Sequence, residues 1–407
     1  MANSQKNLRL RRAVPRGSSA QRHAALEYQP PKLFKVSRNF FVLGIVVVMT
    51  AVGYTLYWFV IATNLKDAVT NWIVARAQQG ITASYSQIEI GGFPSNFRVV
   101  LTDPKLHTAN FAAAGQSEQG AEKWFWQGQR VVAEMKPWNF KKFSVDLSGV
   151  HNLAFKNQNR DYQFSGEVQK MVMAANIFSD GWPRLMQLEI GDLSMSESRS
   201  RAKVTASSAT VASRRLLPGK EQINSPAKTP TFTLKIKFQG LHLPQFLNLP
   251  LGYDIEELSS ELKVIGKFTL SRSVVNLARW RDAGGIIEID TIQGTYGALK
   301  IHAAGTVALD KDLQPLIAMS AKLQGFFPAI NAFKKAGYIR SGDAAIAKLV
   351  LGVLSKRDPK GGRSISLPLT LQDGQLFAGP VPLMAVPAID WGEDPPPLVA
   401  CSGEQLE

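Results

Sequence analysis

The feature that most constrains this chain is an uncharged apolar run over residues 40–62, FFVLGIVVVMTAVGYTLYWFVIA. As a helix rising about 1.5 Å per residue it would span roughly 34 Å, enough to cross a hydrocarbon core of about 30 Å. A core helix of a soluble protein rarely stays uncharged for so long, and the apolar core of a cleaved signal peptide is usually about 7–15 residues. The run therefore predicts an uncleaved transmembrane anchor. Tyr54, Tyr57 and Trp58, near its far end, suit the headgroup level of a membrane.

The charges beside the anchor predict its direction. Residues 1–38 carry nine Lys and Arg residues against one acid, whereas the far flank holds only Lys66 and Arg76 with Asp67 between them. An excess of positive charge stays cytoplasmic. We therefore expect a single-pass protein of the bacterial inner membrane, with a disordered basic cytoplasmic tail over 1–39, a periplasmic domain over 63–391 and a flexible C-terminal tail over 392–407.

Composition narrows the choice of partners. Cys401 is the one cysteine of the 407 residues, so neither an intrachain disulfide nor a cysteine metal site is expected. The formal charge is +15, of which the tail supplies +8 and the rest of the chain +7. The charge of the tail follows from topology, and no nucleic-acid partner is expected. The remaining +7 either favours anionic headgroups or acidic glycans, or belongs to an ordinary solvated surface.

From residue 81 onward the hydrophobic period is typical of strands, with few helices. A helical pattern over 65–79 continues the anchor, and further helices are predicted over 275–282, 327–336 and 344–354. Strands are predicted over 81–90, 97–101, 124–126, 131–135, 143–147, 232–238, 262–268, 286–290, 299–309, 365–372 and 375–378. Asp373-Gly374 is a strong hairpin signal between the last two.

These patterns predict an α+β fold that is mainly antiparallel β, because strands and helices do not alternate regularly. We expect a large curved sheet with a few packed helices. Residues 109–123 and 213–230 have the composition of loops, and the second leaves open a division of the periplasmic domain into two lobes.

The clearest alternation in the chain gives one candidate binding face. Phe232, Leu234, Ile236 and Phe238 fall on one side of a strand, and Thr233, Lys235 and Lys237 on the other. An apolar strand face can line an open groove that holds acyl chains, or it can pack under helices as an ordinary core. The sequence leaves both open.

No catalytic, cofactor or metal site is predicted. The five histidines have neither a second histidine nor an acid at ligand spacing, and G-x-S-x-G, H-E-x-x-H, Walker and G-x-G-x-x-G motifs are absent from the sequence. We therefore expect a protein that is not an enzyme. An envelope hydrolase stays open as a third interpretation, because paired acids can come from distant positions.

A set of turn and aromatic residues, in this order and spacing, resembles a known family. Its members are Gly92, Phe93, Pro94, Trp126, Pro137, Trp138, Trp280, Gly284, Gly285, Asp373, Gly374, Gly379 and Pro380. Over roughly residues 65–391 the chain resembles an uncharacterised family of single-pass inner-membrane proteins from alphaproteobacteria, known as a domain of unknown function. The architecture and the G-T-V-A-L-D strand at 305–310 are also distantly similar to AsmA-type envelope proteins. That likeness implies a β-rich periplasmic domain and a role in lipid traffic or outer-membrane assembly.

The expected function is that of an anchored envelope protein whose apolar groove binds a phospholipid or a lipid-like ligand. The alternative is a structural or assembly factor that binds another envelope protein. Exposed apolar patches in place of a continuous groove would favour the alternative.

Overall fold

The computed structural model describes residues 38–78, 80–108, 123–157, 160–178, 183–216, 230–267, 274–358, 362–379 and 381–391. The chain divides into two compact units, Met1–Tyr54 and Thr55–Glu407. The described part of the first unit is the start of helix α1 (Arg38–Ala77), which continues into the second unit. One helix, over Asn39–Ala77, is long and apolar enough to cross a membrane. The prediction that residues 65–79 extend the anchor helix is confirmed up to Ala77.

The second unit is built around one large antiparallel sheet. Its N-terminal strands are β1 (Ile81–Ser84), β2 (Gln87–Gly91), β3 (Phe97–Thr102), β4 (Lys105–Thr108), β5 (Lys123–Gly128), β6 (Arg130–Lys136), β7 (Asn139–Asp146) and β8 (Gly149–Asn157). The long central strands are β9 (Arg160–Ile177), β10 (Pro183–Glu197), β11 (Lys203–Arg215), β12 (Pro230–His242), β13 (Asp254–Ile265), β14 (Ile286–Tyr296), β15 (Leu299–Leu309) and β16 (Pro315–Gln324). The last are β17 (Lys356–Arg357), β18 (Arg363–Gln372), β19 (Gln375–Ala378) and β20 (Val381–Ala385).

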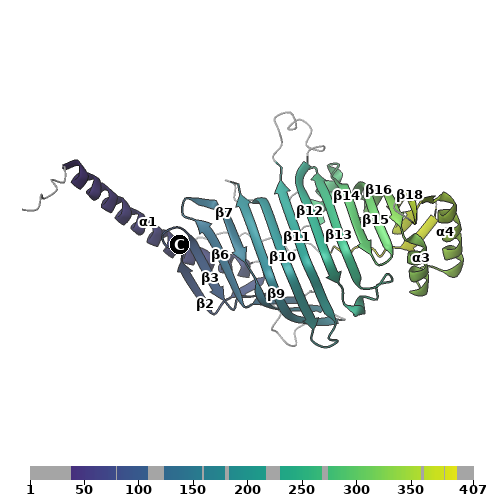
Figure 1. Ribbon diagram of the computed structural model, residues 1–407, viewed down its shortest axis with the longest axis horizontal. Helices are drawn as coiled ribbons and strands as arrows, with labels where there is room; N and C mark the ends of the chain where they lie inside the picture. The colour runs from purple at the N-terminus through teal and green to yellow at the C-terminus, as the bar shows by residue number, and fades with distance from the viewer. Residues whose placement is uncertain are drawn as a thin grey trace, which may run out of the picture. The chain divides into compact units, whose positions relative to one another are not determined.

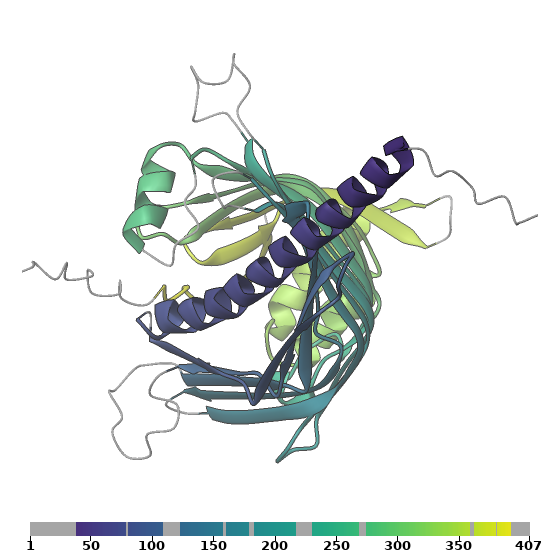
Figure 2. The ribbon, with the colours of Figure 1, turned by 90° about the vertical axis from the view of Figure 1, so that its left-hand side faces the viewer.

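From β9 to β16 each strand pairs with the next strand in the chain, and the sheet continues through β18 and β19 to β20. At β9 it divides into two limbs. The second half of β9 pairs with β7 and leads through β6 and β3 to β2. The first half pairs with β8 and leads through β5 and β4 to β1. Figures 1 and 2 show how the strands of this unit follow a curve that does not close.

The two limbs separate along one line because successive strand pairs break at neighbouring positions. Asp103 and Pro104 separate β3 from β4, Gln129 separates β5 from β6, and Leu147 and Ser148 separate β7 from β8. Backbone bonds still join neighbouring strands along this line, from Asp103 N to Gln129 O at 3.1 Å and from Leu147 N to Met171 O at 2.7 Å. Local irregularities of this kind bend strands, and here they bend adjacent strands together.

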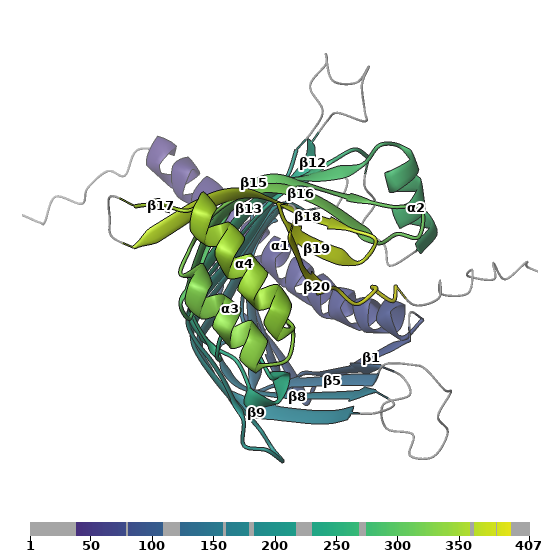
Figure 3. The same cartoon turned by 90° about the vertical axis from the view of Figure 1, so that its right-hand side faces the viewer.

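Four helices accompany the sheet in the part of the chain described above: α1, α2 (Val274–Asp282), α3 (Phe326–Lys335) and α4 (Ser341–Leu354). Helices α3 and α4 lie within the curve of the sheet in Figures 2 and 3, and they cover its inner face at β15, β16 and β18. Among the described residues the largest buried apolar cluster forms there, and it includes Ala321, Phe326, Ile330, Leu351 and Leu367.

The predicted fold class is confirmed, as are the helices near 275–282, 327–336 and 344–354. Asp373 and Gly374 form the predicted hairpin, with φ of 51° and 68°, which suits a tight turn between β18 and β19. The predicted strand over 81–90 is instead divided at residues 85–86. Residues 109–122 and 217–229, within the two predicted loops, lie outside the described residues. The strands that flank the second of these segments, β11 and β12, pair directly with each other.

Candidate functional site

The candidate face on β12 is part of apolar rows that cross the sheet. Residues directly opposite each other in antiparallel strands point to the same face. Ile236 lies opposite Val211 on β11 and Ser260 on β13. Following these partners through the registers gives one row, the central row: Ile90, Val99, Ala133, Val145, Met173, Leu188, Val211, Ile236, Ser260, Ile292, Ala303, Ala321 and Leu367. Only Ser260 in this row is polar.

The neighbouring rows have the same character. Leu234 lies opposite Leu262, and that row continues through Ile289 and Gly305 to Met319. Phe238 begins a third row with Leu258. Thus the four residues predicted on β12 share a face that is apolar across many strands.

Exposure changes systematically along the central row. Val99 at one end is 6% exposed, and Ala303 and Ala321 at the other are 1% and 2% exposed. Between them every member from Ala133 to Ile292 is partly exposed. This stretch, which we call the trough, crosses eight strands: β6, β7 and β9 to β14. At about 4.8 Å per strand it extends for roughly 34 Å.

Helices cover the two ends of the trough face. At one end the second-unit part of α1 packs Trp58 and Ala62 against Phe97, with Ile90 and Met135 beside them. At the other end α3 and α4 cover β15, β16 and β18. The C-terminal end of this face is therefore an ordinary core under helices. Its middle is only partly covered.

The opposite face of the central strands is polar and paired. Lys235 on β12 lies 2.7 Å from Glu261 on β13, and Lys263 lies 2.8 Å from Asp290 on β14. The hydrogen bond that Lys263 donates to the Asp290 carboxylate raises the pKa of Lys263 above its ordinary value. Exposed pairs of this kind contribute little stability, but they keep this face solvated and leave the trough as the apolar side.

An aromatic cluster lies at the limb formed by the first half of β9 with β8, β5, β4 and β1. Tyr162 on β9 stacks on Phe246 in the short helix η3 (Gln245–Leu247) with ring centroids 4.7 Å apart, and Phe164 lies 6.5 Å from Phe246. Nearby Trp126 donates its indole N–H to His151 Nδ1 at 3.2 Å, and His151 Nε2 lies 2.7 Å from Leu147 O. His151 is 4% exposed, so its two bonds satisfy a buried ring at the junction of the limbs.

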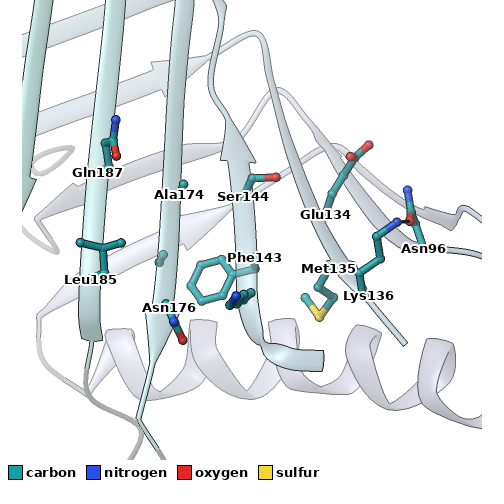
Figure 4. A pocket seen from close by; sticks show the side chains of 12 residues that line it. Asn96, Glu134, Met135, Lys136, Phe143, Ser144, Ala174, Asn176, Leu185 and Gln187 are labelled. Atoms are coloured by element: carbon teal, nitrogen blue, oxygen red, sulfur yellow. Dashed lines mark hydrogen bonds between the residues drawn. The ribbon is translucent and has the colours of Figure 1, made fainter. Parts of the chain in front are cut away.

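A cavity of about 480 Å³ lies at the ends of β6, β7, β9 and β10 (Figure 4). Its lining combines both faces of the sheet. Met135 and Phe143 belong to the apolar side, whereas Glu134, Ser144 and Gln187 belong to the polar side. Its volume suits a small ligand. The cavity lies at the margin of the sheet, however, and no residue of the central row lines it.

Glu197 is the acid with the largest resolved pKa shift, and its hydrogen bonds hold a turn of the chain together. Glu197, at the end of β10, is 3% exposed. Hydrogen bonds from the Ser200 hydroxyl and backbone N–H, and from Arg199 N–H, lower its pKa to about 2. These bonds close the turn between β10 and β11. Within the described ranges no three His, Cys, Asp or Glu side chains form a metal-binding group.

Most of the residues that carry the family resemblance lie in turns or at contacts between helices and strands. Phe93 packs edge-on against Trp58 at 5.5 Å, and the Tyr57 hydroxyl donates to Pro137 O at 2.9 Å. Trp280 donates to Ile265 O at 2.8 Å, and a Cβ on Gly285 would collide with its indole ring. Gly92, Pro94, Gly284, Gly374 and Gly379 lie in turns. Pro380 lies outside the described residues.

Of three comparisons with known proteins, one finds a match. The model of one family, described as "Uncharacterized protein conserved in bacteria" (DUF2125), matches residues 58–387. No curated protein and no solved structure matches the chain. The predicted resemblance to an uncharacterised bacterial family is thereby confirmed, whereas the more distant likeness to AsmA-type proteins stays a prediction.

Proposed function

The chain belongs to this family of conserved bacterial proteins, and from that premise we propose that it is a membrane-anchored envelope protein that binds lipid acyl chains in the trough. The observation that carries the proposal is the central row, which is partly exposed across eight strands and apolar at all of them except Ser260, while helices cover both of its ends. A soluble protein rarely leaves so long an apolar strip partly uncovered without an occupant.

The energetics suit an acyl chain. Each methylene removed from water contributes about 0.8 kcal/mol, so a chain with twelve buried methylenes would gain ~10 kcal/mol before the costs of binding. If the trough covers half of each methylene, the gain falls to ~5 kcal/mol. That magnitude allows a lipid to be held and released, and the polar groups of the lipid would stay in water at the open side.

Exposed aromatic side chains near residue 59 of α1, within the second unit, also favour contact with a membrane surface. Four exposed aromatic side chains gather there, which we call the collar: Phe59, Phe93, Trp138 and Phe140. Phe59 and Phe93 stack at 6.4 Å, and Lys136 lies 5.7 Å above the ring of Trp138. Aromatic rings with basic neighbours are typical of the headgroup level. With the basic tail as the cytoplasmic side, the collar would rest on the periplasmic surface of the inner membrane.

Crosslinking from the two faces of β12 tests the proposal in the full-length protein. A photoreactive benzoylphenylalanine is placed at Ile236, on the trough face, or at Lys237, its neighbour on the polar face, in cells that carry radiolabelled phospholipid. We expect a labelled adduct from Ile236 and none from Lys237. Equal labelling, or none, would contradict the proposal. Adducts with another protein at Ile236 would instead support the assembly-factor alternative.

A further inference from the structure

Helix α4 is apolar on two opposite faces. One face is buried against the sheet through Ala344, Ala347 and Leu351. The other exposes a stripe, which we call the α4 stripe: Ile346, Leu349 and Val353, at 57%, 70% and 78% exposure, together with Leu354 at the end of the helix, at 55%. The first three are spaced by three and four residues, so they line one side of the helix. No described segment covers them, and α4 lies at the right-hand end of the unit in Figure 1, the end that faces the viewer in Figure 3.

The charge of the second unit is concentrated around this stripe. Residues 326–363 hold eight Lys and Arg residues against two acids, a net charge of +6. The chain beyond residue 38 carries +7 in total, so everything outside this segment is close to neutral. Lys334 and Lys335 at the end of α3, and Arg340 just before α4, are exposed. Of the two acids, Asp358 is buried and lies 2.8 Å from Lys322.

We propose that α4 lies on the surface of a bilayer that contains anionic phospholipid, with the α4 stripe among the acyl chains and the basic residues at the headgroups. An apolar stripe next to a cluster of basic residues is the pattern of interfacial helices, and each basic residue near an anionic surface adds to the attraction. Four side chains on one helix fall short of the roughly 800 Å² per partner of a stable protein interface. A bilayer, in contrast, requires no complementary shape.

This surface is separate from the trough. The α4 stripe lies on the side of α4 that faces away from the sheet, so the proposal holds whether or not the trough binds lipid. A protein fixed at its collar end and touching a bilayer at α4 would have lipid contacts at both ends of its sheet.

A local fluorescent probe tests the contact without interference from the basic tail. Full-length protein with Cys401→Ser is held through α1 in nanodiscs of phosphatidylcholine, and an environment-sensitive dye is attached at Leu349→Cys. The control carries the dye at Lys237→Cys on the polar face of β12. Vesicles of phosphatidylcholine with or without phosphatidylglycerol, both containing a lipid-borne quencher, are then added.

We expect a blue shift and loss of more than half of the fluorescence at position 349, only with phosphatidylglycerol, and no change at position 237. No response at 349, or an equal response without phosphatidylglycerol, would overturn the proposal. A blue shift that grows with protein concentration before vesicles are added would assign the stripe to a second copy and would also overturn it.

A charge-reversal pair isolates the electrostatic part. Lys334→Glu with Lys335→Glu should weaken vesicle binding, measured as quenching at position 349, about thirtyfold or more. The matched control, Lys203→Glu with Lys237→Glu, makes the same change in net charge on the sheet and should leave binding unchanged. Equal weakening by both pairs would refute recognition by the α3–α4 segment.

Discussion

Two aspartate substitutions in the central row decide whether the trough is open. Ile236 and Ala321 lie in the same row, four strands apart in pairing order, and their side chains point to the same face. Ile236 is partly exposed, whereas Ala321 is 2% exposed under α3 and α4. An aspartate at each position therefore meets a different environment, although the strand geometry is the same.

The expected costs differ by several kcal/mol. Ile236→Asp loses about half of the ~2 kcal/mol that full burial of the isoleucine would contribute, and its carboxylate can reach water, so we expect a cost of ~1–2 kcal/mol. Ala321→Asp places an unpaired carboxylate among Phe326, Ile330 and Leu351, which should cost ~4 kcal/mol or more.

Thermal unfolding of the full-length protein in nanodiscs, followed by tryptophan fluorescence, measures both. At ~2–4 °C per kcal/mol, Ala321→Asp should lower Tm by ~8 °C or more and Ile236→Asp by only ~4 °C. The folded Ile236→Asp protein should also lose the lipid adduct described above. The reasoning is refuted if both variants lose the same stability, because Ile236 would then lie in a closed core.

Three further outcomes follow from particular contacts. Phe97→Ala should cost ~3–5 kcal/mol, because the ring is fully buried against Trp58, and an unchanged urea midpoint would contradict that packing. Glu197 has a folded pKa of about 2 against an ordinary value of 4.5, so its stabilisation is complete above that ordinary value and is lost as pH falls toward 2. Glu197→Gln should therefore lower the unfolding midpoint at pH 7 and reduce its fall between pH 4.5 and 2; parallel pH curves would exclude this role. Gly285→Ala should displace Trp280 and change its fluorescence, whereas a native emission spectrum would show that the ring position tolerates a Cβ.

Much of the local structure could be predicted, because the signals were local. The period of two over 232–238, the Asp373-Gly374 turn and the apolar run over 40–62 each specify an element from adjacent residues. Strands β9, β10 and β11 were not predicted, although they are the longest group in the sheet. In β11, KVTASSATVASRR, small and polar residues fill both faces, so alternation in hydrophobicity is weak. These strands form because long neighbours pair along their whole length, which a local window does not show.

The sequence predicted the candidate face on one strand, but it did not predict how that face continues across the sheet. Phe232, Leu234, Ile236 and Phe238 were identified from β12 alone, and the structure places them together on the apolar side. The continuation of their rows depends on registers between strands that are distant in sequence. Whether a row is covered depends on where α3 and α4 pack, and that is a tertiary property. The α4 stripe was missed for a related reason, because the pattern of a helix does not show which of two apolar faces is buried.

The position of the covering helices explains why the same apolar face can serve two purposes. A sheet with one fully covered apolar face would be a stable core with no capacity for a ligand, and a sheet with a fully open face would aggregate. Here Phe97 and Trp58 secure one end of the face and the α3–α4 cluster secures the other, so each end is stabilised by its own packing. The eight strands between them can therefore stay partly open without depending on a ligand to fold. If this separation holds, removing lipid should lower the stability of the protein only modestly, whereas disrupting either end cluster should unfold it.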